Sequence, residues 1–278
     1  NEIMLSPNAV EILGERYLKR NKAGEVVESP QELFRRVARA VSAAEQYDAP
    51  LWEERFFGLM QQGVFLPNSP TLMNAGRRLG QLAACFVLPV EDSMDGIFGA
   101  LRNAALIHKS GGGTGFAFSR LRPKNSMVGT TGGVASGPVS FMKIFNTATE
   151  QVKQGGTRRG ANMAILKVDH PDIMEFIFSK RDNHDLNNFN ISVGVSDAFM
   201  KAAADKSEYD LIDPRDQTHV DKLNAAEVYR ALVKRAWKNG DPGIIFLDRI
   251  NRDNPTPALG EIESTNPCGE QPLLPLEA

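Results

Sequence analysis

The spacing of apolar residues changes once along the chain, near residue 82. Before that point apolar positions recur every three or four residues, which is typical of helices that bury one face. Ser6 and Ser29, each followed by a proline, are typical helix starts, because a serine hydroxyl accepts a hydrogen bond from the first turn. The pattern predicts helices between residues 6 and 62, in a small helical N-terminal domain over residues 1–65.

Beyond residue 82, short apolar runs alternate with longer segments of helical period. This alternation is typical of parallel strands joined by helices, in an open sheet or a barrel. We expect an α/β domain over residues 66–278, with five strands that form a small open sheet or half of a large barrel. The predicted strands are Ala84–Leu88, Gly115–Phe118, Met163–Val168, Phe189–Val195 and Gly243–Leu247. The predicted helices are Met94–Lys109, Pro138–Val152, Pro171–Lys180, Asp197–Ala204 and Ala225–Lys238.

The composition narrows the class of protein. In 278 residues, 42% are hydrophobic and 24% charged, which is enough for a sizeable core. The 32 basic and 34 acidic residues leave a net charge of -2, so no basic excess points to duplex nucleic acid or an anionic membrane. No apolar stretch approaches the roughly 20 residues of a spanning helix, and the N-terminus lacks the order of a signal peptide. We expect a soluble, cytoplasmic protein with no membrane and no direct nucleic-acid partner.

Cysteine and histidine are scarce. Cys85 and Cys268 are the two cysteines, too few for a disulfide scaffold or a zinc site built on cysteine. The four histidines have no metal-ligand spacing, so no metal site is expected: they are His108, His170, His184 and His219. The chain starts at Asn1 and stops within an apolar run, which indicates a portion of a longer fold.

The segment Ser110–Gly115 is rich in glycine, which lets a backbone approach a ligand closely. It lacks the Lys-Ser or Lys-Thr of a phosphate-binding loop. It also precedes a predicted strand, whereas a dinucleotide fingerprint follows one. The segment is therefore either a tight turn or a ligand loop.

Two further glycine-containing loops carry cations. Gln154–Gly160 includes Arg158 and Arg159, whose guanidinium groups suit bidentate contacts with a phosphate or a base edge. A solvated surface turn is the alternative. The loop after the second predicted strand carries Arg122 and Lys124. Basic loops on two successive strand–helix units favour binding of an anionic ligand.

Asn266–Glu270 places an amide, a thiol and a carboxylate at alternate positions. In an extended strand this spacing would point Asn266, Cys268 and Glu270 to one side. Together they would offer a hydrogen-bond partner, a redox or nucleophilic sulfur and a general base. A Pro-Gly turn with an incidental cysteine is the alternative.

The order of short motifs along nearly the whole chain resembles the catalytic subunit of a ribonucleotide reductase, most closely its adenosylcobalamin-dependent, class II branch. Each motif is weak alone, and the ordered set is specific. The resemblance implies a ten-stranded α/β barrel of two halves, with a radical cysteine on a loop through its centre. This chain would supply the helical domain and the first half-barrel. The motifs are Asn68–Thr71, Ala84-Cys85, Glu91–Asp95, Lys109–Gly115, Gln154–Asn162 and Asn266–Glu270.

The resemblance implies roles at the catalytic centre. Cys268 corresponds to the transient thiyl radical that takes hydrogen from the ribose 3′ carbon. Glu270 corresponds to the base for the 3′-hydroxyl proton, and Asn266 to the amide that orients the ribose. Cys85 resembles one of two cysteines that reduce the 2′ carbon. The implied substrate-binding residues are Ser69, Ala84, Cys85, Gly113, Asn266, Pro267, Cys268, Gly269 and Glu270.

A second implied site binds deoxynucleoside triphosphate effectors. In the family, the loop that corresponds to Gln154–Asn162 relays the identity of the effector to the substrate base. The implied effector-binding residues are Asp92, Ser93, Met94, Arg122, Lys124, Gln154, Arg158 and Arg159.

The implied enzyme is a vitamin B12-dependent ribonucleoside-diphosphate reductase, which makes 2′-deoxyribonucleotides for DNA synthesis. It would be a homodimer that uses adenosylcobalamin and a thioredoxin-like dithiol, with no cobalamin-contacting residue assignable in this chain. The second reducing cysteine and second half-barrel are missing. We therefore expect the chain to be the N-terminal portion of a split, intein-interrupted or truncated reductase, inactive alone but able to bind effector. If the reductase is split, a second chain would carry the rest of the barrel.

Four other interpretations stay open, of which a purely structural protein is the least favoured. One is a class I large subunit, whose radical comes from a separate metal-containing subunit. Another is a glycyl-radical lyase on the same barrel, although the two basic loops argue against it. The third is a non-catalytic nucleotide-binding and dimerisation module, in which the helix after Asp92 pairs with its mate on a second subunit.

Overall fold

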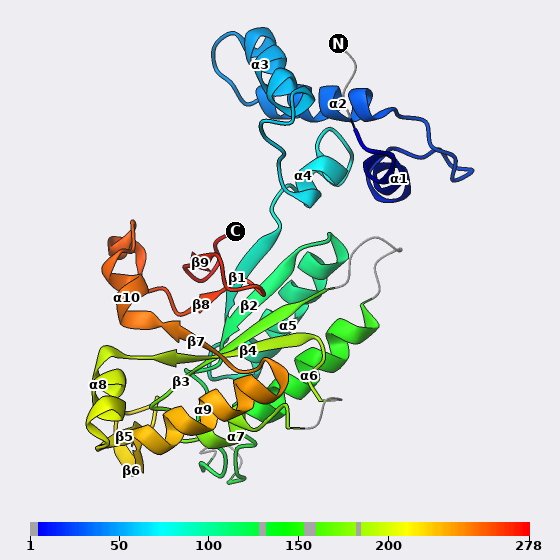
Figure 1. The fold of residues 1–278 in the computed structure, drawn as a ribbon. Helices are drawn as coiled ribbons and strands as arrows, with labels where there is room; N and C mark the ends of the chain where they lie inside the picture. Colours follow the sequence, from blue (N-terminus) through cyan, green and yellow to red (C-terminus); the bar gives the residue numbers. More distant parts are fainter. Residues whose placement is uncertain (1–4, 128–131, 153–159, 182–184) are drawn as a thin grey trace. The chain divides into compact units, whose positions relative to one another are not determined.

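The chain forms two compact units, Asn1–Ala84 and Cys85–Ala278 (Figure 1). The computed structural model describes residues 5–127, 132–152, 160–181 and 185–278. The predicted domain boundary lies at residue 65, whereas the two compact units divide between Ala84 and Cys85. Helix α4 (Ser69–Asn74) belongs to the first unit, because the Arg36 guanidinium donates hydrogen bonds to the carbonyls of Leu72 and Ala75.

The first unit is helical, as predicted. Helix α2 begins with a capping box, in which Ser29 and Glu32 satisfy each other's backbone N–H groups. One face of α2, including Leu33 and Val37, is buried in the core of this unit, together with Phe57 of α3. Its longer helices are α1 (Pro7–Arg16), α2 (Pro30–Ser42) and α3 (Ala49–Gln61).

The second unit is built on a parallel sheet of five strands in the order β1-β2-β3-β4-β7. All five predicted strands are confirmed, with ends that shift by at most two residues. This architecture confirms the α/β class and is consistent with one part of a barrel. The strands are β1 (Cys85–Pro89), β2 (Gly113–Ala117), β3 (Asn162–Lys167), β4 (Phe189–Val195) and β7 (Gly243–Phe246).

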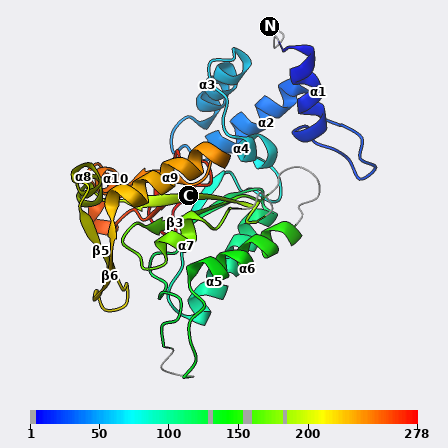
Figure 2. The same cartoon turned by 60° about the horizontal axis from the view of Figure 1, so that its bottom comes forward.

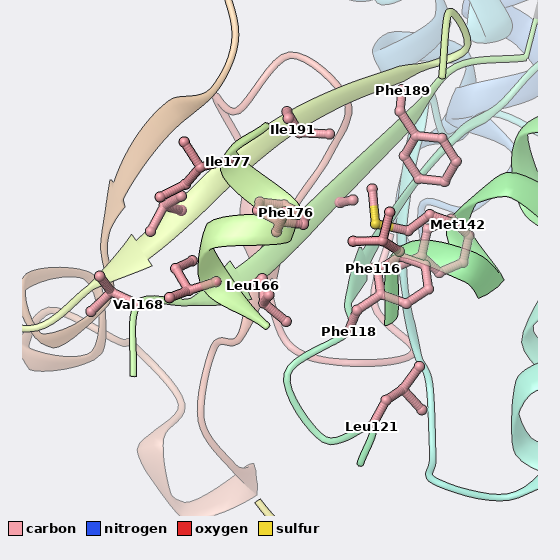
Figure 3. Packing of buried hydrophobic residues seen from close by; sticks show 14 of the residues in the cluster. Phe116, Phe118, Leu121, Met142, Leu166, Val168, Phe176, Ile177, Phe189 and Ile191 are labelled. Carbon is pink, nitrogen blue, oxygen red and sulfur yellow. The ribbon is translucent and has the colours of Figure 1, made fainter. Parts of the chain in front are cut away.

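Helices pack on one face of this sheet. Alternate strand residues such as Phe116 and Leu166 point into the apolar layer between the sheet and the helices. Figure 3 shows Phe116, Phe118, Phe189 and Met142 gathered in this layer. The helices that contribute to it are α5 (Met94–Lys109), α6 (Pro138–Gln151), α7 (Ile173–Ile177), α8 (Asp197–Asp205) and α9 (Ala225–Asn239).

The opposite face of the sheet receives a short hairpin near the C-terminal end of the chain. Strand β8 (Ser264–Thr265) contacts β2 and β3 and pairs with β9 (Pro272–Leu273). Helix α10 (Leu247–Arg252) contacts β4, where the Leu247 side chain packs on Gly194. Figure 1 shows β8 and β9 beside β1 and β2. The two faces of the sheet therefore carry different structures.

Several elements differ from the predicted pattern. The hairpin β5 (Glu208–Ile212) and β6 (His219–Asn224) was not predicted, because β6 is mostly exposed and has no apolar run. Helix α7 ends at Ile177 instead of Lys180, and the Lys180 ammonium group binds Asp241 and the carbonyl of Phe189. The short helices α4 and α10 and the 3₁₀ turn η1 (Pro257–Leu259) were also missed.

The residues that the structure describes contain no candidate membrane-spanning helix. None of their helices combines the length and the apolar character that crossing a bilayer requires.

Replacement of Phe116 by alanine is expected to lower the free energy of unfolding of the second unit by about 3–5 kcal/mol. The Phe116 ring is fully buried and packs against the rings of Phe118, Phe145 and Phe189. Trp237→Ala is the control, because Trp237 of α9 is 86% exposed and its replacement should change stability little. Urea unfolding followed by circular dichroism measures both, and equal losses would contradict this core.

Candidate active site

Asn266–Glu270 forms the tight turn between β8 and β9. The Asn266 carboxamide oxygen accepts from the Gln271 N–H at 2.9 Å, and the Asn266 carbonyl accepts from the Gly269 N–H at 3.1 Å. Gly269 has a φ of 86°, in the region that favours glycine. Of the two conformations left open by the sequence, the turn is present. The extended arrangement is wrong: Asn266 is buried, while Cys268 and Glu270 are exposed.

The turn is fixed to the face of the sheet opposite helices α5 to α9. A Cβ on Gly115 would overlap the carbonyl oxygen of Thr265, and one on Gly113 would lie 2.7 Å from Cγ of Pro267. The Asn190 carboxamide also donates to the Pro267 carbonyl at 2.6 Å. Two glycines of β2 therefore make room for the turn, and an amide of β4 holds it. We call Asn266–Glu270 the cysteine turn.

The first strand brings a second thiol to the cysteine turn. Cys85 begins β1, is buried and lies opposite Gly113 in the sheet register. The Asn266 carboxamide nitrogen donates to the Cys85 sulfur at 3.2 Å. Neither cysteine takes part in a disulfide; Cys85 is buried and Cys268 is exposed. Two segments that are remote in sequence thus form one polar cluster.

The predicted substrate-binding residues fall in both units. Ser69 lies in the first unit at the start of α4, with its hydroxyl 3.0 Å from that of Tyr17. Ala84 is the last residue of that unit. The cysteine turn and the strands that contact it hold the others: Cys85, Gly113, Asn266, Pro267, Cys268, Gly269 and Glu270.

The predicted effector residues gather where α5 begins. The Arg122 guanidinium Nε lies 2.8 Å from one oxygen of the Asp92 carboxylate, and the Arg122 N–H donates to the other at 3.2 Å. Ser93 caps α5 by accepting from the Gly96 N–H, and Met94 is exposed. The structure therefore brings Asp92, Ser93, Met94 and Arg122 together.

The other predicted effector residues are not all part of this group. The Lys124 ammonium lies 3.1 Å from the Glu175 carboxylate, and its backbone N–H donates to Asp172. Burial raises the pKa of the Asp172 carboxyl, although this N–H lowers it in part. Gln154, Arg158 and Arg159 lie outside the described residues.

A charged cleft of about 300 Å³ opens at the carboxyl ends of β2 and β3. In it, Arg120 binds the carboxylates of Glu91 and Glu263. Burial lowers the pKa of Arg120, but the two carboxylates outweigh this effect and raise it. Within the described ranges, no three side chains of His, Cys, Asp or Glu lie close enough to share a metal ion.

Sequence reasoning missed the residues that seat the cysteine turn. Gly115 was seen as part of a glycine-rich segment, but its contact with Thr265 joins two distant parts of the chain. Asn190 lies within a strand that was predicted on its apolar residues alone. An interior strand glycine is the one available signal, since it often marks a close backbone approach.

A helical domain followed by a parallel half-barrel sheet, with a cysteine turn on the face away from the helices, defines the class of protein. Residues 83–278 match the model of the ribonucleotide reductase barrel domain. Residues 3–80 match the model of the ribonucleotide reductase all-alpha domain. The chain belongs to the ribonucleotide reductase large-subunit family.

Curated proteins from three organisms are similar to the chain over most or all of its length. The chain is 48% identical to the vitamin B12-dependent ribonucleoside-diphosphate reductase of Thermoplasma acidophilum, over 100% of this chain and 44% of that protein. It is 51% identical to the protein of the same description from Mycobacterium tuberculosis, over 100% of this chain and 41% of that protein. A vaccinia virus ribonucleoside-diphosphate reductase large subunit is 30% identical over 88% of this chain and 35% of that protein. The chain thus spans less than half the length of these relatives.

Gly115→Ala is expected to destabilise the second unit by about 1–3 kcal/mol or more, because the added methyl group must displace a backbone carbonyl. It should also speed alkylation of the Cys85 thiol, because displacement of the cysteine turn uncovers that sulfur. Gly99→Ala in α5 is the control, since a Cβ there meets nothing within 4 Å and alanine favours helix. Thermal unfolding and alkylation rates measure both effects, and similar behaviour of the two variants would refute this packing.

Proposed function

We propose that the chain is the N-terminal part of a vitamin B12-dependent ribonucleoside-diphosphate reductase, which makes deoxyribonucleotides for DNA synthesis in the cytoplasm. One observation carries this proposal: the cysteine turn packs on the open face of the half-barrel and holds Asn266 against Cys85. Relatives of that description at 48% and 51% identity support it.

The residue types of this site suit radical reduction of a ribose. In the proposal, a thiyl radical on Cys268 takes the hydrogen atom from the ribose 3′ carbon and becomes a thiol again. The 3′-hydroxyl then becomes more acidic, and the Glu270 carboxylate accepts its proton. The 2′-hydroxyl accepts a proton from the Cys85 thiol and leaves as water. Cys85 and a second cysteine, which this chain does not contain, supply two electrons and form a disulfide. The Cys268 thiol finally returns its hydrogen atom to the 3′ carbon and is a thiyl radical again.

The two thiols differ in exposure, which suits the radical role proposed for Cys268 and the reducing role proposed for Cys85. Adenosylcobalamin is the proposed cofactor, and when bound it supplies the radical that oxidises a thiol. The exposed Cys268 at the tip of a turn is accessible to a group outside the chain, whereas Cys85 is buried. No described residue is assigned to the cobalamin. A thioredoxin-like dithiol is the proposed reductant for the disulfide that includes Cys85.

The start of α5 is the proposed site for a deoxynucleoside triphosphate effector. A helix N-terminus attracts anions through its free N–H groups and its dipole. Arg122 adds a cation there, and the Asp92 carboxylate fixes the position of its guanidinium group. This combination supports recognition of a phosphate-bearing ligand.

The outer surface of α5 is the proposed homodimer contact. Met94, Phe98 and Leu106 are exposed on this helix, and Ile144 is exposed on the adjacent α6. A second copy of the same surface would cover these apolar side chains with matching ones. The proposed effector site lies at one end of this surface, so a dimer would bring two such sites near the subunit contact.

Calorimetry with each of the four deoxynucleoside triphosphates tests the effector site. Saturable binding to the chain is expected, with about a tenfold or greater loss in Asp92→Ala, because that variant frees the Arg122 guanidinium from its fixed position. Asp95→Ala removes the same charge from an exposed position of the same helix turn, and should bind within a few-fold of wild type. No binding, or equal losses in both variants, would contradict the assignment.

Joining residues 1–278 to the remainder of the Mycobacterium tuberculosis relative tests the catalytic proposal. We expect the chimera to reduce a ribonucleoside diphosphate with adenosylcobalamin and a dithiol, because the Cys268 thiol is accessible to the cofactor. The Cys268→Ser chimera should bind effector equally well and show no turnover. Turnover by this serine variant, or turnover without adenosylcobalamin, would point to a different radical source, such as the separate subunit of class I reductases.

A further inference from the structure

Four buried polar side chains form a hydrogen-bonded chain within the apolar layer between the helices and the sheet. His108 of α5 lies with Nε2 2.9 Å from the hydroxyl of Thr114 in β2. Thr114 donates to the carboxamide oxygen of Asn162 in β3 at 2.8 Å. Asn162 in turn donates through its carboxamide nitrogen to Thr149 of α6 at 2.9 Å. We call these four residues the polar chain.

The hydrogen bonds of the polar chain all donate in one direction, from His108 toward Thr149. The Thr149 hydroxyl donates to the carbonyl of Phe145 at 2.8 Å, so toward Asn162 it only accepts. The single hydroxyl proton of Thr114 goes to Asn162. Thr114 therefore accepts from His108, whose imidazole must carry a proton on Nε2. Burial lowers the pKa of His108 to about 4, so the ring is neutral near pH 7 with its proton on that nitrogen.

The polar chain cross-links α5 and β2 at one end, and an ion pair cross-links them at the other. His108 lies in the last turn of α5, and Thr114 lies at the start of β2. Asp92 precedes α5, and its partner Arg122 follows the end of β2. The helix, about 24 Å long at 1.5 Å per residue, is therefore tied to β2 at its last turn and to the loop that follows β2 at its start.

The contact between His108 and Thr114 lies on the helix side of β2, across the strand from the cysteine turn. Thr114 follows Gly113, which contacts Pro267 of the turn. Gly160 lies so close to His108 that a Cβ there would be 2.8 Å from Cγ of the imidazole. Displacement of His108 therefore presses on the strand that seats the turn and on the backbone just before β3.

We propose that His108 is a positioning residue that couples the start of α5 to the cysteine turn through its hydrogen bond to Thr114. The proposal rests on the proposed function, in which the start of α5 binds a nucleotide and the turn carries the reactive thiol. A nucleotide that shifts α5 moves β2 with it, because the helix is attached to β2 at one end and to the loop that continues from β2 at the other. Coupling between sites typically changes a measured constant by about 5–150-fold.

Two variants distinguish the effect of the hydrogen bond that His108 donates from the effect of the volume of its ring. His108→Gln keeps an N–H donor at a similar reach, so it should preserve the bond to Thr114. His108→Leu fills much of the space but leaves the Thr114 hydroxyl without its donor. A residue that only fills space would tolerate leucine at least as well as glutamine.

The first measurement is the tautomer of His108 in the intact chain, by ¹⁵N-edited NMR of histidine-labelled protein. The expected result is a neutral ring protonated on Nε2 at pH 7, assigned by the loss of that signal in His108→Gln. A ring protonated on Nδ1, or a cationic ring, would overturn the proposal. This result does not depend on any nucleotide.

The second measurement is the rate at which iodoacetamide alkylates Cys268, with and without each deoxynucleoside triphosphate. A change of about fivefold or more is expected in wild type, none in His108→Leu that still binds nucleotide, and a restored change in His108→Gln. A change that persists in the leucine variant, or none in a wild type that binds, overturns the coupling. A wild type that binds no nucleotide instead contradicts the effector site of the proposed function, and the tautomer then decides the role of His108.

Discussion

The close approach of Thr265 to Gly115 is the constraint on which the rest of the site depends. A side chain at position 115 would need the space that the Thr265 carbonyl fills, so the cysteine turn can lie on the sheet only because this strand residue has no Cβ. Every other contact of the turn follows from this seating. The Asn266 amide reaches the Cys85 sulfur, and Asn190 reaches the Pro267 carbonyl, only while the backbone stays this close.

The pleat of the strands allows one sheet to pack against helices on one face and to hold the cysteine turn on the other. Residues such as Phe116 that face the helices are large and apolar, and they bury the layer that stabilises the fold. The β2 residues that face the other way, Gly113, Gly115 and Ala117, are small, and the two glycines leave room for the cysteine turn. Because successive side chains alternate between faces, β2 packs against the helices through Thr114 and Phe116 and seats the cysteine turn through Gly113 and Gly115.

The period of the apolar residues predicted the strands and helices of the second unit, because those residues face a continuous core. Periodicity carried no information on the β5–β6 hairpin, most of which faces solvent. Nor could it decide between a strand and a turn at Asn266–Glu270. The turn is closed by a backbone bond from Gly269 to Asn266 and by the Asn266 carboxamide oxygen, and neither bond leaves a period in the apolar residues. The site residues were found by their resemblance to family motifs, while the packing of Gly115 and the bond from Asn190 join segments whose proximity only the fold determines.

Joining a helix to a strand through a buried polar chain costs desolvation free energy for four polar groups. Apolar side chains of similar shape would avoid that cost. What it adds is geometric definition: each donor in the chain has one acceptor, so helix and strand have a single relative register. Apolar contacts alone would allow α5 to slide along β2 with little penalty. With the Asp92–Arg122 pair at one end and His108–Thr114 at the other, a displacement at the start of the helix cannot be absorbed along its length. The structure therefore favours transmission of small movements from the carboxyl end of β2 to its amino end, where the cysteine turn rests.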